Sequence, residues 1–245
     1  MTIIVLVHGV GLDRHMWTEF ARVLDRPVRT YDLIGLGSGP HPGGPYSLDQ
    51  YAEQLAGIVG KDVVDLVGFS MGALVAQRFT IDHPSRVRRL VLVSGVFDRS
   101  PQERTAIAAR VDQVRSGAYL STIEPALERW FTPAFGVANP GVIESVRQRM
   151  LANDPEAYAC AYEVFSHGDS ELVSELCRIT APTLVVAGGC DERSTPAMAE
   201  RMVARMTTST CVVMPMLRHL IPLEAPAELA SLVGNFLNEI GDTDG

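Results

Sequence analysis

The chain has 245 residues, a net charge of −8 and a composition that is 47% hydrophobic and 20% charged. These proportions are typical of a globular protein with one sizeable core, and the acidic balance argues against a nucleic-acid partner, which would need a basic surface facing phosphates. No apolar stretch approaches the roughly 20 residues of a membrane span, so we expect no membrane association.

Short β-branched runs alternate with helical stretches along most of the chain, which is the pattern of a parallel sheet covered on both faces. We expect strands over residues 2–8, 28–32, 63–68, 90–94, 183–187 and 210–214. Helices are expected over residues 48–59, 70–82, 197–206 and 226–240, the first after the cap residue Ser47 and the third after Thr195-Pro196.

Residues 98–180 interrupt this alternation. They contain no convincing strand and several helical segments, over residues 102–116, 122–131, 141–152, 155–167 and 170–179. A crossover between parallel strands needs only about a dozen residues. We therefore predict an all-helical lid (98–180) inserted into an α/β core (1–97 and 181–245), the alternative being a set of ordinary crossover helices.

The segment Gly68-Phe69-Ser70-Met71-Gly72 follows an apolar strand and opens a helix. A GxSxG sequence in this position is the nucleophile elbow, a strained turn that pushes the serine hydroxyl outward. Glycine on each side of the turn lets strand and helix approach each other. Ser70 is therefore the predicted nucleophile.

The segment His8-Gly9-Val10-Gly11 follows the first strand. In this position the backbone N–H of Val10 can face a developing oxyanion, and the N–H of Met71 can supply a second hydrogen bond. The alternative is a plain glycine turn. His8 itself is expected to have a structural role.

A serine nucleophile needs a base and an acid that orients it. Asp191 and His219 each follow a predicted strand, so they should reach the same edge of the sheet as Ser70. Asp98, shortly after the strand over residues 90–94, is the rival acid. We predict Ser70, Asp191 and His219 as the catalytic triad.

The four cysteines, Cys160, Cys177, Cys190 and Cys211, have neither metal-ligand spacing nor a CxxC pair. We expect free thiols in a reducing cytoplasm, and neither a metal nor an organic cofactor.

These motifs together resemble the α/β-hydrolase superfamily, in its lid-bearing form. The elements that carry the resemblance run in family order: VLVHGVGLDRHMW, YDLIGLGSGP, LVGFSMGALVAQRF, LVVAGGCDERSTP and LRHLIPLEAPAE. The stretch ALERWFTPAF is similar to bacterial hydrolases of aromatic catabolism such as 3-oxoadipate enol-lactonases. Many relatives carry a β-hairpin before the first parallel strand, whereas this sequence starts almost at that strand, which predicts a mostly parallel sheet of about six strands. The loop GLGSGP also departs from the usual GxGxS.

The resemblance implies hydrolysis of a small carboxylic ester or enol-lactone through an acyl-enzyme, by a bacterial enzyme of the carboxylesterase or lactonase type. One alternative keeps the triad but cleaves a C–C bond or an amide in a ring-cleavage product of aromatic or heterocycle catabolism. Another is a ligand receptor without catalysis. The expected partner is a small molecule, and the chain is expected to be a monomer or a homodimer.

The predicted substrate contacts are Arg14, Trp17, Phe69, Trp130 and Leu220, which flank the motifs or lie in the lid. Arg14 is the first candidate to pair with a substrate carboxylate, because its loop is close to the chemistry. Arg129 and Arg147 are the candidates within the lid.

Overall fold

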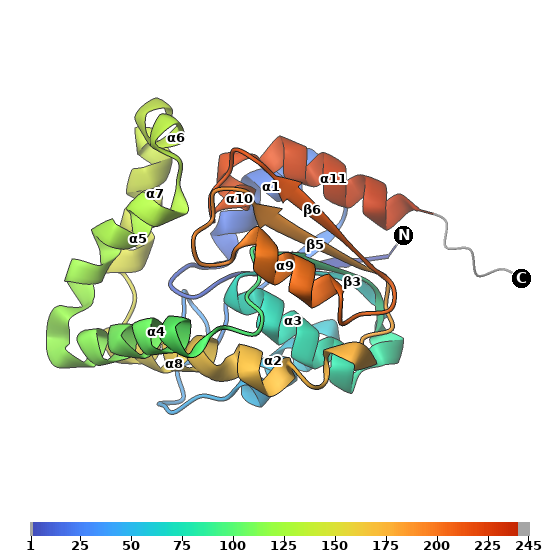
Figure 1. The fold of residues 1–245 in the computed structure, drawn as a ribbon, viewed down its shortest axis with the longest axis horizontal. Helices are drawn as coiled ribbons and strands as arrows, with labels where there is room; N and C mark the ends of the chain where they lie inside the picture. The colour runs from blue at the N-terminus through green and yellow to red at the C-terminus, as the bar shows by residue number, and fades with distance from the viewer. Residues whose placement is uncertain (1, 240–245) are drawn as a thin grey trace, which may run out of the picture.

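The computed structural model describes residues 2–239 and forms an α/β fold around one six-stranded sheet (Figure 1). All neighbouring strands pair in parallel, in the order β2-β1-β3-β4-β5-β6. The strands are β1 (Ile4–Val7), β2 (Val28–Thr30), β3 (Val64–Phe69), β4 (Val87–Val93), β5 (Thr183–Gly188) and β6 (Ser209–Met214). Each lies where the hydrophobic pattern predicts a strand, so the predicted parallel sheet is confirmed.

Burial explains the position of each strand in the sheet. Every residue of β1, β3 and β5 is buried, which matches their largely apolar sequences. The exception to the apolar pattern in β3 is Asp65, whose buried carboxylate pairs with Arg88 at 2.5 Å. The residues of β2 are half-buried and those of β6 are half-buried or exposed, as expected for the two edge strands. The continuous apolar core therefore runs through the centre of the sheet.

Helices cover both faces of the sheet. The helices of the core are α1 (Thr18–Leu24), α2 (Leu48–Val59), α3 (Met71–Asp82), α9 (Pro196–Val203), α10 (Ile221–Glu224) and α11 (Pro226–Asn238). Figure 1 shows α1, α10 and α11 together on one side of the sheet and α2 and α3 on the other. The predicted last helix extends to residue 240 and the predicted core to residue 245, and residues 240–245 lie outside the described residues.

The segment between β4 and β5 is helical throughout its described elements. It contains α4 (Pro101–Gln113), a π-helical turn (Val114–Ala118), α5 (Ile123–Trp130), α6 (Pro133–Ala138), α7 (Pro140–Leu151) and α8 (Pro155–Leu172). Figure 1 places α5 and α7 beyond the arrowheads of β5 and β6, while α8 packs against α3. These helices therefore stand at the carboxyl edge of the sheet, where the loops that follow the strands gather.

One helix boundary in this segment differs from the prediction. The segments 155–167 and 170–179 are a single helix to Leu172, followed by a short 3-10 turn (Leu176–Arg178). Gly168 does not break the helix because it is buried, in contact with Leu74 of α3, and a Cβ there would lie 3.1 Å from Leu74 Cδ1. Tertiary packing thus outweighs the low helix propensity of glycine.

A buried ion pair joins α8 to the chain that leaves β4. The Arg99 guanidinium lies 3.1 Å from the Asp169 carboxylate, and both side chains are almost fully buried. Asp169 also accepts a hydrogen bond from the Arg99 N–H at 2.9 Å. Arg99 in turn lies over the ring of Phe165, at 4.3 Å from its centroid. This contact fixes the start of the helical segment against its last long helix.

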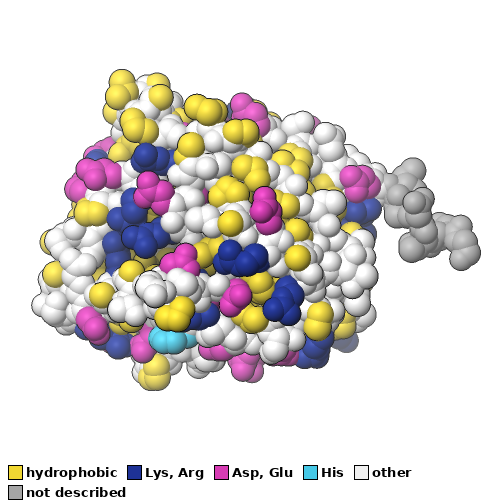
Figure 2. All heavy atoms as spheres, viewed as in Figure 1, with side chains coloured by type: hydrophobic (Ala, Val, Ile, Leu, Met, Phe, Trp, Pro, Cys, Tyr) yellow, Lys and Arg dark blue, Asp and Glu magenta, His cyan; other side chains and the backbone are white. Residues whose placement is uncertain are grey.

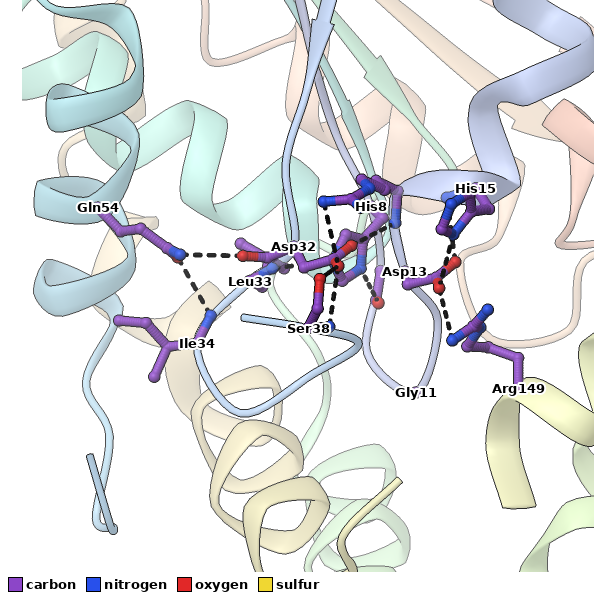
Figure 3. Close-up of polar contacts among 12 residues, drawn as sticks. His8, Gly11, Asp13, His15, Asp32, Leu33, Ile34, Ser38, Gln54 and Arg149 are labelled. Carbon is purple, nitrogen blue, oxygen red and sulfur yellow. Dashed lines mark hydrogen bonds and ion pairs between the residues drawn. The ribbon is translucent and has the colours of Figure 1, made fainter. Parts of the chain in front are cut away.

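Asp32 organises the loops beside β1 (Figure 3). Its carboxylate accepts hydrogen bonds from the backbone N–H groups of Arg14 and Ser38, at 2.8 and 2.9 Å, and from the Ser38 hydroxyl at 2.6 Å. Burial raises the pKa of Asp32, but these hydrogen bonds outweigh it and hold the pKa below its ordinary value. The carboxylate therefore stabilises the loop that follows β1.

We expect Asp32→Asn to lower the free energy of unfolding by about 1–3 kcal/mol at pH 7, because an amide cannot accept all of these hydrogen bonds. The folded-state pKa is depressed, so this stabilisation is present above the unfolded-state pKa of about 3.9 and is lost as the pH falls through the lower folded value. Urea unfolding at pH 7 and pH 3 should show a difference from wild type that shrinks at pH 3. The exposed Asp112→Asn is the control, and a difference independent of pH would contradict this account.

Candidate active site

Ser70 occupies a sharp turn between β3 and α3. Its backbone dihedrals are φ 54° and ψ −115°, a conformation that costs a residue with a side chain about 1–3 kcal/mol. The Ser70 N–H donates to the Val93 carbonyl at 2.9 Å, which anchors the turn to the neighbouring strand β4. The turn thus holds the hydroxyl at the carboxyl edge of the sheet.

The glycines on both sides of Ser70 are required by close backbone packing. A Cβ on Gly68 would overlap the Gly72 carbonyl oxygen. A Cβ on Gly72 would overlap the carbonyl oxygens of Val7 and His8, in the chain that leaves β1. The spacing of the motif therefore reflects the contact between the turn, its own helix and the adjacent strand.

The hydroxyl of Ser70, the imidazole of His219 and the carboxylate of Asp191 form a continuous chain of hydrogen bonds. Ser70 Oγ lies 3.1 Å from His219 Nε2, and His219 Nδ1 lies 2.6 Å from Asp191 Oδ2. All three residues are buried. Because an ionised carboxylate can only accept, His219 donates Nδ1–H to Asp191 and is left with Nε2 free to accept from Ser70.

The environment of Asp191 keeps it ionised. Burial raises its pKa, but the electrostatic interaction and hydrogen bond with His219 and the backbone N–H groups of Ser194 and Arg193 outweigh burial. The pKa of Asp191 is therefore below its ordinary value. These two N–H groups donate to Oδ1 at 3.0 and 2.9 Å, while Oδ2 faces the imidazole. Each carboxylate oxygen thus has its own partner.

Backbone contacts bring the loops of Asp191 and His219 together. Cys190 N–H donates to the Leu217 carbonyl at 2.9 Å, and a Cβ on Gly188 would overlap the Arg218 carbonyl oxygen. The hydroxyl of Ser94, at the end of β4, donates to the His219 carbonyl at 2.8 Å. Ser94 is buried with φ 49°, and nothing in the sequence pattern singled it out.

The structure separates the two candidate acids. Asp191 contacts His219, whereas Asp98 is exposed and its backbone carbonyl accepts from Arg201 at 3.4 Å. His8 hydrogen-bonds backbone groups of the loops beside β1, in line with the structural role expected from the sequence. Its ring accepts from the Leu33 N–H at 2.9 Å and lies 2.8 Å from the Gly9 carbonyl (Figure 3), and burial lowers its pKa, so the imidazole is neutral.

The predicted oxyanion donors are free. Within residues 2–239, neither the Val10 N–H nor the Met71 N–H donates to another residue, and Met71 is the first residue of α3. A Cβ on Gly9 would lie 3.1 Å from Ser70 Cβ, so the loop after β1 runs beside the serine. The N-terminus of α3 adds a positive dipole at the same point.

A pocket opens over Ser70 and His219. The core contributes side chains from the loops after β1, β3, β4 and β5. The helical segment contributes Glu103, Ala106, Ile107 and Arg110 of α4, Arg129 and Trp130 of α5, and Tyr162 and Phe165 of α8. The four residues of α4 follow the spacing i, i+3, i+4, i+7, which marks one helix face. The sequence shows this spacing, but it does not show that this face of α4 is directed at the pocket.

Of the predicted substrate contacts, Phe69 and Trp130 line the pocket. Their rings lie 5.0 and 6.2 Å from the His219 ring. Arg14, Trp17 and Leu220 do not line it. The Arg14 guanidinium lies 3.8 Å from Asp32, and Trp17 and Leu220 are fully buried in the core, where Trp17 packs edge-on against Phe69. Of the arginine candidates in the helical segment, Arg129 lines the pocket and Arg147 pairs with Glu124 at 2.6 Å.

Within residues 2–239, no group of three or more His, Cys, Asp or Glu side chains could hold a metal ion. No helix among these residues is long and apolar enough to cross a membrane.

The chain is similar in sequence to two hydrolases of Acinetobacter baylyi. The (E)-2-((N-methylformamido)methylene)succinate hydrolase is 28% identical over 233 residues, 92% of this chain and 86% of the relative. The 3-oxoadipate enol-lactonase 2 is 28% identical over 236 residues, 91% of this chain and 84% of the relative.

Solved structures show the same similarity over nearly the whole chain. The enol-lactonase of Burkholderia xenovorans superposes with a TM-score of 0.89 at 26% identity, covering 97% of this chain and 92% of that structure. A thermophilic esterase of Thermogutta terrifontis, solved with malate bound, has a TM-score of 0.88 at 29% identity, covering 97% and 89%. The model of the alpha/beta hydrolase family matches residues 4–232, and the chain belongs to that family.

Proposed function

We propose that the chain hydrolyses a small carboxylic ester or enol-lactone, with Ser70 as the nucleophile. The observation that carries this proposal is the hydrogen-bond chain from Ser70 through His219 to Asp191, which opens directly into the pocket. The named relatives, an enol-lactonase and an esterase among them, support the same class of reaction.

The geometry suits acyl transfer in two steps. Ser70 Oγ attacks the carbonyl carbon while His219 Nε2 takes its proton, and Asp191 stabilises the imidazolium that forms. His219 then protonates the leaving oxygen, which leaves an acyl-enzyme. A water molecule, deprotonated by His219, attacks this acyl group and releases the acid and Ser70.

The N–H groups of Val10 and Met71 are proposed as the oxyanion hole. Both lie beside Ser70 and are free of other partners within the described chain. Donors already aimed at a developing charge typically lower the barrier by about 3–4 kcal/mol each. The oxygen of the attacked carbonyl would therefore point to the start of α3.

We further propose that residues 98–180 act as a lid on the core formed by residues 1–97 and 181–245. Helices α4, α5 and α8 supply one wall of the pocket, and the Leu220 N–H donates to the Trp130 carbonyl at 3.0 Å, next to His219. Such a wall excludes water and strengthens the electrostatic interactions inside the pocket.

A second candidate is hydrolysis of an amide. It is favoured by one observation: a relative at 28% identity is named for hydrolysis of an N-methylformamido compound. Ser70, His219 and Asp191 could cleave an amide in the same way, because His219 can protonate a leaving nitrogen as well as a leaving oxygen.

A fluorophosphonate probe tests the proposed nucleophile directly. We expect it to modify the protein once, at Ser70, as located by peptide mass spectrometry, and to abolish hydrolysis of p-nitrophenyl acetate and butyrate in proportion to labelling. Prior heat unfolding should prevent labelling. A folded protein that stays unlabelled, or that is labelled at a different serine, would contradict the proposal.

A further inference from the structure

Three arginines from separate elements converge on the wall of the pocket. Arg110 comes from α4, Arg129 from α5 and Arg193 from the loop after β5. Figure 2 shows basic side chains gathered beside a hollow in this face of the molecule. Burial lowers the pKa of the Arg129 guanidinium, and the charges of Arg110 and Arg193 lower it further.

None of these three guanidiniums forms an ion pair with a residue in the range 2–239, whereas Arg99, beside them in the same pocket, pairs with Asp169. Arg110 Nη2 donates to the Thr122 carbonyl at 2.7 Å, but Arg110 Nε is buried and has no partner among the described residues. Arg110 and Arg129 are half-buried and Arg193 is exposed. Positive charges gathered around one pocket repel one another, and a bound anion relieves that repulsion.

Arg99 adds a further free donor. Only 3% of the residue is exposed, and its Nη2 has no hydrogen-bond partner among residues 2–239 although Nη1 is fully engaged by Asp169 and by carbonyls of α8. Because Arg99 lines the pocket, this donor is available to a bound ligand.

The acidic side chains of the pocket do not neutralise this cluster. Asp191 is held by His219 and two backbone N–H groups. The Glu103 carboxylate caps α4 by accepting from the Ser100 N–H at 2.7 Å. Glu192 is exposed and forms no ion pair with a described residue. Guanidinium groups bind carboxylates and phosphates through paired N–H donors.

We propose that the pocket selects esters or lactones carrying a second, anionic group, a carboxylate or a phosphate, which Arg110 and Arg129 bind at a distance from the bond that Ser70 attacks. The apolar side chains between them, Ile107, Trp130 and Phe165, suit the carbon chain that joins the two ends. This inference rests on the proposed function, because it assigns the substrate class of the same site.

The test compares monomethyl adipate, which carries a free carboxylate, with neutral dimethyl adipate. We expect kcat/KM for the monoester to exceed that for the diester about 10- to 100-fold, the range of a hydrogen bond between charged groups. In Arg110→Gln and in Arg129→Gln, measured separately, this ratio should fall toward one. A methyl ester ending in a phosphate, assayed beside these, shows which anion is preferred.

The exposed Arg205→Gln is the matched control, and its ratio should equal that of the wild type. Equal kcat/KM for the two adipate esters in the wild type would overturn the inference. So would a monoester-to-diester ratio that stays at the wild-type value in both variants. Neither result would contradict the proposed hydrolase function.

Calorimetry separates the inference from the proposed function. Monomethyl adipate should bind to the Ser70→Ala variant, which has lost only the hydroxyl, and bind more weakly when Arg129→Gln is added. Binding without any turnover by the wild type would disprove the serine mechanism and keep the anion site. Turnover that does not depend on the arginines would support the serine mechanism and disprove the anion site.

Discussion

Replacing Ser70 by alanine is expected to lower kcat for p-nitrophenyl butyrate by about 10⁵- to 10⁶-fold. The variant has no oxygen to attack the carbonyl, and only the oxyanion donors and the pocket would still assist attack by water. The measurement is steady-state hydrolysis with enzyme concentrations high enough to detect the residual rate.

Thermal unfolding controls for the fold of this variant. The Ser70 side chain contributes one hydrogen bond, to His219 at 3.1 Å, so the unfolding midpoint of Ser70→Ala should lie close to that of the wild type. The exposed Ser116→Ala should change neither activity nor midpoint. A Ser70→Ala protein that retains a tenth of the wild-type kcat would exclude Ser70 as the nucleophile.

Asp191→Asn is expected to lower kcat by about 10⁴-fold while the protein stays folded. The reason lies in the partners of the two carboxylate oxygens. The N–H groups of Arg193 and Ser194 face Oδ1, so the amide oxygen of asparagine takes that place and its NH₂ faces His219. His219 Nδ1 must then accept, the ring proton moves to Nε2, and the imidazole can no longer take the proton of Ser70.

Asp98→Asn is the matched control. Asp98 was the rival candidate for the acid in the sequence, and in the structure it is exposed. Its kcat should equal that of the wild type. If Asp98→Asn lost activity and Asp191→Asn did not, the assignment of the acid would be wrong. The two variants carry the same change of charge, so charge alone cannot explain a difference between them.

The positions of the proposed catalytic residues were predictable because each depends on a short stretch of sequence. The elbow Gly68–Gly72 depends on one strand, one turn and one helix, and steric overlap allows only glycine at its two ends. Asp191 and His219 each follow an apolar run, and parallel strands deliver the residues after them to the same edge.

The lining of the pocket was not predictable in the same way. Arg14 is near the chemistry in sequence, but its neighbour in space is Asp32, which lies on the loop after β2. Between Arg110 and Arg129 lie the π-helical turn and a 3-10 turn (Tyr119–Thr122). The hydrophobic periodicity of α4 and α5 does not say how the two helices face each other across these turns. The hydrogen bond from Ser94 to the His219 carbonyl joins residues 125 positions apart.

The sequence by itself determined the parallel sheet, the strained turn at Ser70 and the order of the three proposed catalytic residues, because burial of apolar strands and backbone overlap act over a few neighbouring residues. The sequence favoured Asp191 over Asp98, and the tertiary structure shows Asp191 in contact with His219. Only the tertiary structure decided that Arg110, Arg129 and Arg193 share one cavity. Those contacts depend on how helices and loops distant in the chain pack together, and packing of this kind is settled by shape and charge across the whole core.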